Sequence, residues 1–125
     1  MSYNILLVDD SSTMRSVIAR TLKMAQVPVG DMYEAANGEE ALEILKDSWV
    51  DLLFTDINMP VMDGIELINI IMEDDTMKSI PVVVISTEGS TARINELQGK
   101  GIKAYLKKPF TPEQIKSVIT EVLGG

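Results

Sequence analysis

Short apolar runs alternate along the chain with stretches whose apolar residues recur at helical spacing. The runs at 4–8, 32–35, 52–55, 82–85 and 104–107 are typical of buried strands. Residues 13–25, 91–100 and 111–123, and stretches beginning near 37 and 64, show the helical pattern. Strands and helices that alternate in this way predict an α/β fold, a parallel sheet covered on both faces. Since such crossovers are right-handed, we expect a five-stranded, doubly wound, three-layer sandwich.

Specific residues predict where two of these elements begin. The second strand is expected only from Met32, because Pro28 and Gly30 interrupt the pattern before it. The last helix should begin after Thr111, where Pro112 fits the first helical position and Gln114 completes a capping box. Its apolar stripe follows at i, i+3, i+4, i+7 and i+8: Ile115, Val118, Ile119, Val122 and Leu123.

Length and composition favour one domain that can build its own core. The chain has 125 residues, of which 46% are hydrophobic, too many for a disordered protein. The apolar runs are too short to span a bilayer. Asp9 and Asp10 interrupt the first of them, so it does not resemble a signal segment. We therefore expect a cytoplasmic protein with no membrane contact, and a monomer.

The residue types that are missing exclude several chemistries. The chain has no cysteine and no histidine. Disulfides, thiolate metal sites, histidine-ligated zinc and Ser-His-Asp catalysis are therefore ruled out. The net charge of −8 also argues against direct binding to nucleic acid. This charge is uneven, since residues 1–75 carry 15 acids and 4 bases whereas residues 76–125 carry 4 and 7.

Polar residues fall where the predicted strands end. Asp9 and Asp10 follow the first strand, Asp56 the third, Ser86 the fourth, and Lys108 lies just past the fifth. Parallel strands end at one sheet edge, where open α/β folds bind ligands. If the strand order is 2-1-3-4-5, one of the common orders for such sheets, these four strands are neighbours. We expect the five side chains to converge on one crevice.

Three carboxylates in one crevice need positive charge around them. Two unit charges about 4 Å apart repel by about 4 kcal/mol at an effective dielectric near 20, against a domain stability of only about 5–15 kcal/mol. Lys108 offers one charge, and hard oxygen ligands favour Mg²⁺ for the rest. An aspartate can then serve as a nucleophile that forms an aspartyl phosphate, with Lys108 and Ser86 neutralising the phosphoryl oxygens.

Each of these residues also has a simpler interpretation. An acid pair before a helix often only caps it, and a lone lysine is usually solvated. Asp63-Gly64 is a common turn pair, and Tyr105 could be a half-buried strand residue. Capping and turns do not explain why five such residues occur at the ends of strands on one edge, so we prefer the shared site.

The same residues carry a family resemblance. The motifs are Val8-Asp9-Asp10, Thr55–Pro60, Met62-Asp63-Gly64, Ile85-Ser86 and Lys108-Pro109-Phe110. In this order they resemble the receiver domains of response regulators, most of all the single-domain CheY-like group. The resemblance covers residues 1–125 as one receiver domain. It implies the flavodoxin-like strand order 2-1-3-4-5 and a role as phosphoacceptor in a two-component phosphorelay.

The resemblance implies a phosphoacceptor and a metal site. Asp56 would receive the phosphoryl group. Asp10 and Asp56 would contact Mg²⁺ directly, Asp9 largely through water, and the backbone carbonyl of Asn58 would complete the protein ligands.

It also implies a switch. Ser86 would hydrogen-bond the phosphoryl group and Lys108 would pair with it. The Lys108-Pro109 bond would be cis. Tyr105 would move inward when Ser86 moves toward the phosphate. Asn58 and Glu88 occupy the two positions that tune dephosphorylation, and both match the CheY proteins, which suggests a short-lived signal.

Partners follow from the same resemblance. The donor would be a phosphohistidine on a sensor kinase. The output face would comprise the fourth helix, fifth strand and fifth helix, and its lysines would attract an acidic segment of a target: Lys100, Lys103, Lys107 and Lys116. The output would be chemotaxis-like. A relay intermediate that passes its phosphoryl group to a second histidine protein, or a receiver cut from a longer DNA-binding regulator, are alternatives.

Other function classes fit less well. A flavin binder would need a phosphate loop after the first strand, where Asp9 and Asp10 would repel the phosphate. An aspartyl-phosphate phosphatase would need an acid two residues after its nucleophile, where this chain has Asn58. A degenerate receiver would lack one of the pocket acids. We expect a signalling domain, not an enzyme with turnover.

Overall fold

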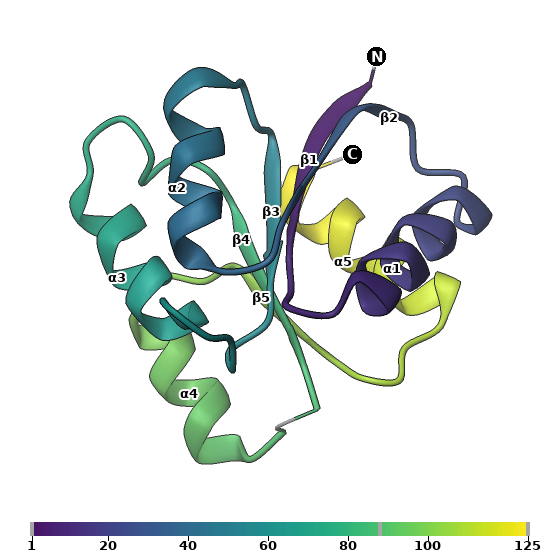
Figure 1. Cartoon of the computed structure of the whole chain (residues 1–125). Coiled ribbons are helices and arrows are strands. Elements are labelled where there is room, and N and C mark those ends of the chain that lie inside the picture. The colour runs from purple at the N-terminus through teal and green to yellow at the C-terminus, as the bar shows by residue number, and fades with distance from the viewer. Residues whose placement is uncertain (1, 88, 125) are drawn as a thin grey trace.

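A computed structural model describes residues 2–87 and 89–124, and it contains a parallel sheet of five strands in the order β2-β1-β3-β4-β5 (Figure 1). The strands are β1 (Tyr3–Val8), β2 (Val29–Ala35), β3 (Leu52–Thr55), β4 (Val82–Ser86) and β5 (Ala104–Lys107). The helices between and after them are α1 (Ser12–Met24), α2 (Gly38–Asp47), α3 (Gly64–Glu73), α4 (Thr91–Gly99) and α5 (Pro112–Leu123). The predicted fold class and strand order are both confirmed.

The helices form two layers, one on each face of the sheet (Figure 1). Leu53 of β3 belongs to a core shared with α2, α3 and α4, whereas Leu52 and Phe54 belong to a core shared with α1 and α5. Successive side chains of a strand point to opposite faces, and both faces are covered here. The central strands are therefore apolar throughout, which explains their continuous hydrophobic runs.

Each of these helices is preceded by an N-cap residue whose side chain accepts a hydrogen bond from a backbone N–H in the first turn. These N-cap residues are Ser11, Asn37, Asp63, Ser90 and Thr111. The last of them forms the predicted capping box with Gln114. Each cap contributes about 1 kcal/mol, so the helix starts are fixed locally. Within residues 2–87 and 89–124, none of the helices is long and apolar enough to cross a membrane.

The second strand begins earlier than the sequence predicts. It starts at Val29 and includes Gly30, not at Met32. β2 is an edge strand that pairs only with β1, and the register shifts between Tyr3 and Ile5. An edge strand is half solvated, so it can hold exposed or glycine residues that a pattern of buried positions does not reveal.

Helical spacing in the sequence predicts that the third helix buries Ile65, Ile68 and Met72. Ile68 is fully buried as predicted, but the other fully buried residues are Leu67 and Ile71. Ile65 and Met72 are only partly buried against the same core. The apolar stripe of this helix is wide, and its packing against α2 and in the core shared with β4 and α4 buries one side of it.

The start of α3 is packed against the backbone that follows β3. The Gly64 amide donates a hydrogen bond of 2.7 Å to the Ile57 carbonyl. A Cβ atom added to Gly64 would lie 2.1 Å from the Asp56 carbonyl oxygen. Glycine is needed here because the helix and the loop that carries Asp56 touch backbone to backbone.

We expect Gly64→Ala to lower the free energy of unfolding by about 1–3 kcal/mol or more, because the obstructing atom is main chain that cannot move aside. Urea denaturation measures this. The matched control is Gly99→Ala, where a Cβ would meet nothing within 4 Å. That change should leave stability unaltered or raise it by up to about 1 kcal/mol. Equal effects of the two substitutions would contradict the close approach.

Candidate functional site

The ends of four strands meet at the carboxyl edge of the sheet. Asp9 and Asp56 are the first residues after β1 and β3, Ser86 is the last residue of β4, and Lys108 follows β5. Hydrogen bonds continue the sheet into these positions, from the Asp56 amide to the Val8 carbonyl at 2.9 Å and from the Lys108 amide to the Ser86 carbonyl at 2.9 Å. The predicted convergence is confirmed for these segments.

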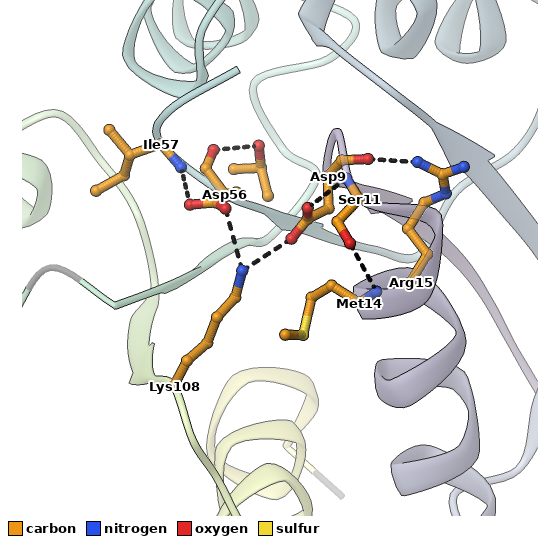
Figure 2. A network of polar contacts seen from close by, with 8 residues as sticks. Asp9, Ser11, Met14, Arg15, Asp56, Ile57 and Lys108 are labelled. Carbon is orange, nitrogen blue, oxygen red and sulfur yellow. Dashed lines mark hydrogen bonds and ion pairs between the residues drawn. The ribbon is translucent and has the colours of Figure 1, made fainter.

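Lys108 joins two carboxylates that come from different strands. Its Nζ lies 2.9 Å from Asp9 Oδ2 and 3.1 Å from Asp56 Oδ2, and Figure 2 shows it reaching between them. The three side chains are largely buried, with 10%, 3% and 15% of their surface exposed for Lys108, Asp9 and Asp56. Partial burial by itself lowers the pKa of the Lys108 ammonium, but the hydrogen bonds and charges of both acids outweigh it and raise the pKa above its ordinary value. The ammonium therefore stays charged at neutral pH.

The remaining oxygen of each buried carboxylate is held by its own loop. Asp9 Oδ1 accepts the Ser11 amide at 2.9 Å, and Asp56 Oδ1 accepts the Ile57 amide at 2.6 Å (Figure 2). Each carboxylate is thus fixed by a backbone donor on one side and by Lys108 on the other. Such preorganisation keeps the charges together without further rearrangement.

Asp10 adds a third acid on the solvent side. One carboxylate oxygen from each of Asp9, Asp10 and Asp56 lies within 4.8 Å of the other two. Asp10 is exposed, whereas Asp9 is buried. Lys108 balances one of the three negative charges, so about two remain. The donor set consists of hard oxygen atoms, which suits Mg²⁺ or a similar divalent ion in both charge and ligand type.

Arg15 belongs to this site although the sequence did not point to it. Its Nη1 donates to the Asp9 carbonyl (Figure 2). Its Nε lies 2.8 Å from Glu34 Oε1, so Arg15 links α1 to β2 and to the residue that follows β1. Only 16% of its side chain is exposed. One signal was available, because a cation in the first turns of a helix faces the positive end of the helix dipole. A cation at such an unfavourable position is expected to be held there by contacts with other parts of the fold.

The other predicted residues lie at or near the same edge. Ser86 is 1% exposed and pairs with Lys107 in the β4–β5 ladder. Tyr105 packs against the core on the α2–α3–α4 side, and its hydroxyl oxygen is buried. Asn58 is exposed on the loop two residues after Asp56. The Lys108-Pro109 bond is cis as expected, while Glu88 lies outside the described residues.

Comparison with known proteins gives a consistent picture. The chain matches the family described as the response regulator receiver domain over residues 5–120. It is 42% identical to chemotaxis protein CheY1 of Helicobacter pylori, with 96% of each chain covered. It is 39% identical to a chemotaxis protein CheY homolog of Campylobacter jejuni, covering 96% of this chain and 92% of the other. A solved CheX-CheY-BeF3-Mg complex from Borrelia burgdorferi is 30% identical with a TM-score of 0.88, covering 97% and 89%.

Replacing Lys108 with Met should lower the free energy of unfolding by about 1–3 kcal/mol in metal-free buffer, because Asp9 and Asp56 lose the cation between them. Since the pKa of Lys108 is raised, this contribution is complete below the ordinary lysine pKa. It disappears only as the pH rises through the raised value. The difference between wild type and variant should therefore be constant near neutral pH and shrink in strong alkali.

The matched control is Lys78→Met, since Lys78 pairs with Asp75 at 3.0 Å in an exposed turn after α3. We expect a change below about 0.5 kcal/mol for that surface pair. Urea denaturation of both variants across pH measures the contrast. A Lys108→Met protein as stable as the control would show that the buried ammonium does not hold the site together.

Proposed function

This chain belongs to the response regulator receiver family, and from that premise we propose that it is a phosphorylation-controlled switch with Asp56 as phosphoacceptor. The family match and the CheY-type relatives support a role in two-component signalling. The observation that carries the proposal is the Lys108 ammonium between Asp9 and Asp56, with the Asp10 carboxylate in the same cluster. Histidine kinase, target and pathway are inferred from the family.

The proposed metal is Mg²⁺. Asp10 and Asp56 would bind it directly, Asp9 through water, and the backbone carbonyl of Asn58 would complete the set. The all-oxygen donor set and its unbalanced negative charge support this choice. The Borrelia relative is described in a complex with Mg and BeF3, which is consistent with it. When bound, the ion would neutralise oxygens of the incoming phosphoryl group.

The proposed chemistry is transfer of a phosphoryl group between two side chains. A carboxylate oxygen of Asp56 would attack the phosphorus of a phosphohistidine, so that a P–O bond forms while the P–N bond breaks and the imidazole leaves. Lys108 Nζ already lies 3.1 Å from Asp56 Oδ2, where it would stabilise the charge of the transferred group. Arg15 would act as a positioning residue, because it holds the Asp9 backbone.

Ser86 and Tyr105 would convert the new charge into a change of surface. A phosphoryl group adds up to about two negative charges, which would draw the Ser86 hydroxyl and the Lys108 ammonium toward it. Tyr105 lies on the adjoining strand with its hydroxyl oxygen buried, so an inward position of the ring is compatible with the packing. Phosphorylation would then increase the population of that arrangement.

The proposed output surface is the α4-β5-α5 face. Lys103, Lys107 and Lys116 are exposed there, and Lys100 donates to Asn69 of α3 at 3.3 Å. This positive surface suits an acidic segment of a target, with an affinity that falls as salt rises. We infer that the protein is a cytoplasmic signalling domain. We also infer that it has no enzymatic turnover, since Asn58 stands where an aspartyl-phosphate phosphatase would carry its second acid.

We expect MgCl₂ to raise the melting temperature of the protein, because a ligand that binds only the folded state stabilises it. Asp10→Asn should melt higher than wild type without metal, since one repulsive charge is gone, and should respond little to MgCl₂. Differential scanning calorimetry measures both effects. In the control Asp31→Asn, which removes an exposed acid of β2, the response to MgCl₂ should match wild type. An undiminished response in Asp10→Asn would argue against this metal site.

Incubation with acetyl phosphate and Mg²⁺ should add one phosphoryl group to the wild type, detected by intact mass spectrometry. Asp56→Asn should gain no stable adduct, because an amide cannot form the acyl phosphate. Asp31→Asn again serves as the control and should be modified like the wild type. An adduct of equal yield on Asp56→Asn would place the acceptor elsewhere and refute the proposed role of Asp56.

A further inference from the structure

A groove lies at the amino edge of the sheet, opposite the acid cluster. One pocket of about 280 Å³ opens between the end of α2 and the segment that leads into β4. A second pocket of about 370 Å³ adjoins it, since both are lined by Leu45, Thr76 and Met77. We call the two together the α2–α3 groove. Its walls are largely apolar, with Leu45, Trp49, Val50, Met77, Ile80 and Pro81 in the first pocket.

Trp49 stands at the rim of this groove with 76% of its surface exposed. Its position is fixed, because its indole N–H donates to Asp51 Oδ1 at 2.9 Å. Asp51 Oδ2 in turn accepts the Asn4 amide at 2.8 Å, which ties it to β1. An exposed indole held in place loses little conformational freedom on binding, and tryptophan is the residue type most enriched at the energetic centres of interfaces.

The charges around the groove are mainly negative. Residues 43–51 and 73–81 contain six carboxylates but only two ammonium groups. Both ammonium groups are already paired within their own turn, Lys46 with Glu43 at 3.1 Å and Lys78 with Asp75 at 3.0 Å. Asp51 and Asp74 line the groove itself. The surroundings therefore attract positive charge and repel an acidic partner.

We propose that the α2–α3 groove binds a basic, partly apolar segment of a partner protein. An apolar side chain of that segment fills the pocket between Leu45 and Met77. An arginine or lysine stacks on the exposed face of Trp49, where cation–π attraction and the nearby carboxylates act in the same direction. A symmetric contact between two copies through this groove is disfavoured, since it would bring two acidic rims together.

This binding is independent of the proposed phosphorylation. The groove residues precede β3 and β4, whereas Asp56 and Ser86 lie at their far ends. Among the residues that the structure describes, none lines both places. A basic partner and a phosphoryl group could therefore occupy the protein together, and the groove offers a second contact distinct from the α4-β5-α5 face.

A random-peptide library displayed on phage provides the probe. It is selected on the wild-type chain of 125 residues after depletion on Trp49→Ala, since the exposed Trp49 side chain can be removed without disturbing the core. Enriched peptides are expected to combine Arg or Lys with Leu, Met or an aromatic residue. A synthetic copy of an enriched peptide should bind the wild type, as measured by calorimetry. Its affinity for Trp49→Ala should be lower by about ten-fold or more. Its affinity for the wild type should fall as the NaCl concentration rises.

Two controls separate this site from others. Met24→Ala removes another exposed large apolar side chain, 64% accessible on α1, and should bind the peptide like the wild type. Asp56→Asn should also bind it unchanged, so loss of phosphorylation would not affect the result.

Three outcomes would overturn the proposal. One is that no enriched peptide depends on Trp49, and another is that the enriched peptides are acidic. The third is a dimer of the wild type, seen by sedimentation and abolished by Trp49→Ala, since it would assign the groove to a second copy of the chain.

Discussion

The Lys108 ammonium between two buried carboxylates is the interaction on which the carboxyl edge of the molecule depends. Asp9 and Asp56 follow adjacent strands, so sheet geometry alone forces their charges together. Lys108 follows the edge strand β5 and reaches both carboxylates. Each carboxylate also accepts a hydrogen bond from a backbone amide. The fold thus concentrates negative charge and balances only part of it. That residual charge is what suits the edge to a divalent ion and then to a phosphoryl group.

Much of this arrangement could be predicted because it follows from local patterns. Buried strands are continuous apolar runs, and a polar residue directly after such a run must lie at the edge of a parallel sheet. Hydrophobic periodicity does not determine which strands are neighbours in the sheet. The strand order was therefore predicted from the family resemblance. Edge strand β2 was misplaced at its start because solvated positions such as Gly30 carry no burial pattern.

Arg15 shows the other limit of sequence interpretation. Its partners are the Asp9 carbonyl, which no side-chain pattern reveals, and Glu34, which lies 19 residues away on β2. Only the folded chain brings them together. Gly64 is similar, since its motif suggested a turn but the need for glycine comes from the Asp56 carbonyl that a Cβ would meet. Contacts to main-chain atoms across elements are the features that sequence patterns conceal.

The uneven charge of the chain acquires a spatial meaning once the fold is known. Lysines gather just after α4, on β5 and on α5, while carboxylates surround both the carboxyl edge of the sheet and the opposite rim at the ends of α2 and α3. The two edges are connected by β1, β3 and β4, whose side chains are almost wholly buried. Close-packed strands of this kind transmit a signal only if they have a second arrangement. Tyr105 lies on the edge strand β5 and would provide the second arrangement in the proposed switch, whereas the α2–α3 groove lies before β3 and β4. In the proposed switch, a change at Asp56 would reach the lysine face through Ser86 and Tyr105, whereas the groove is built by other residues at the opposite end of β3 and β4.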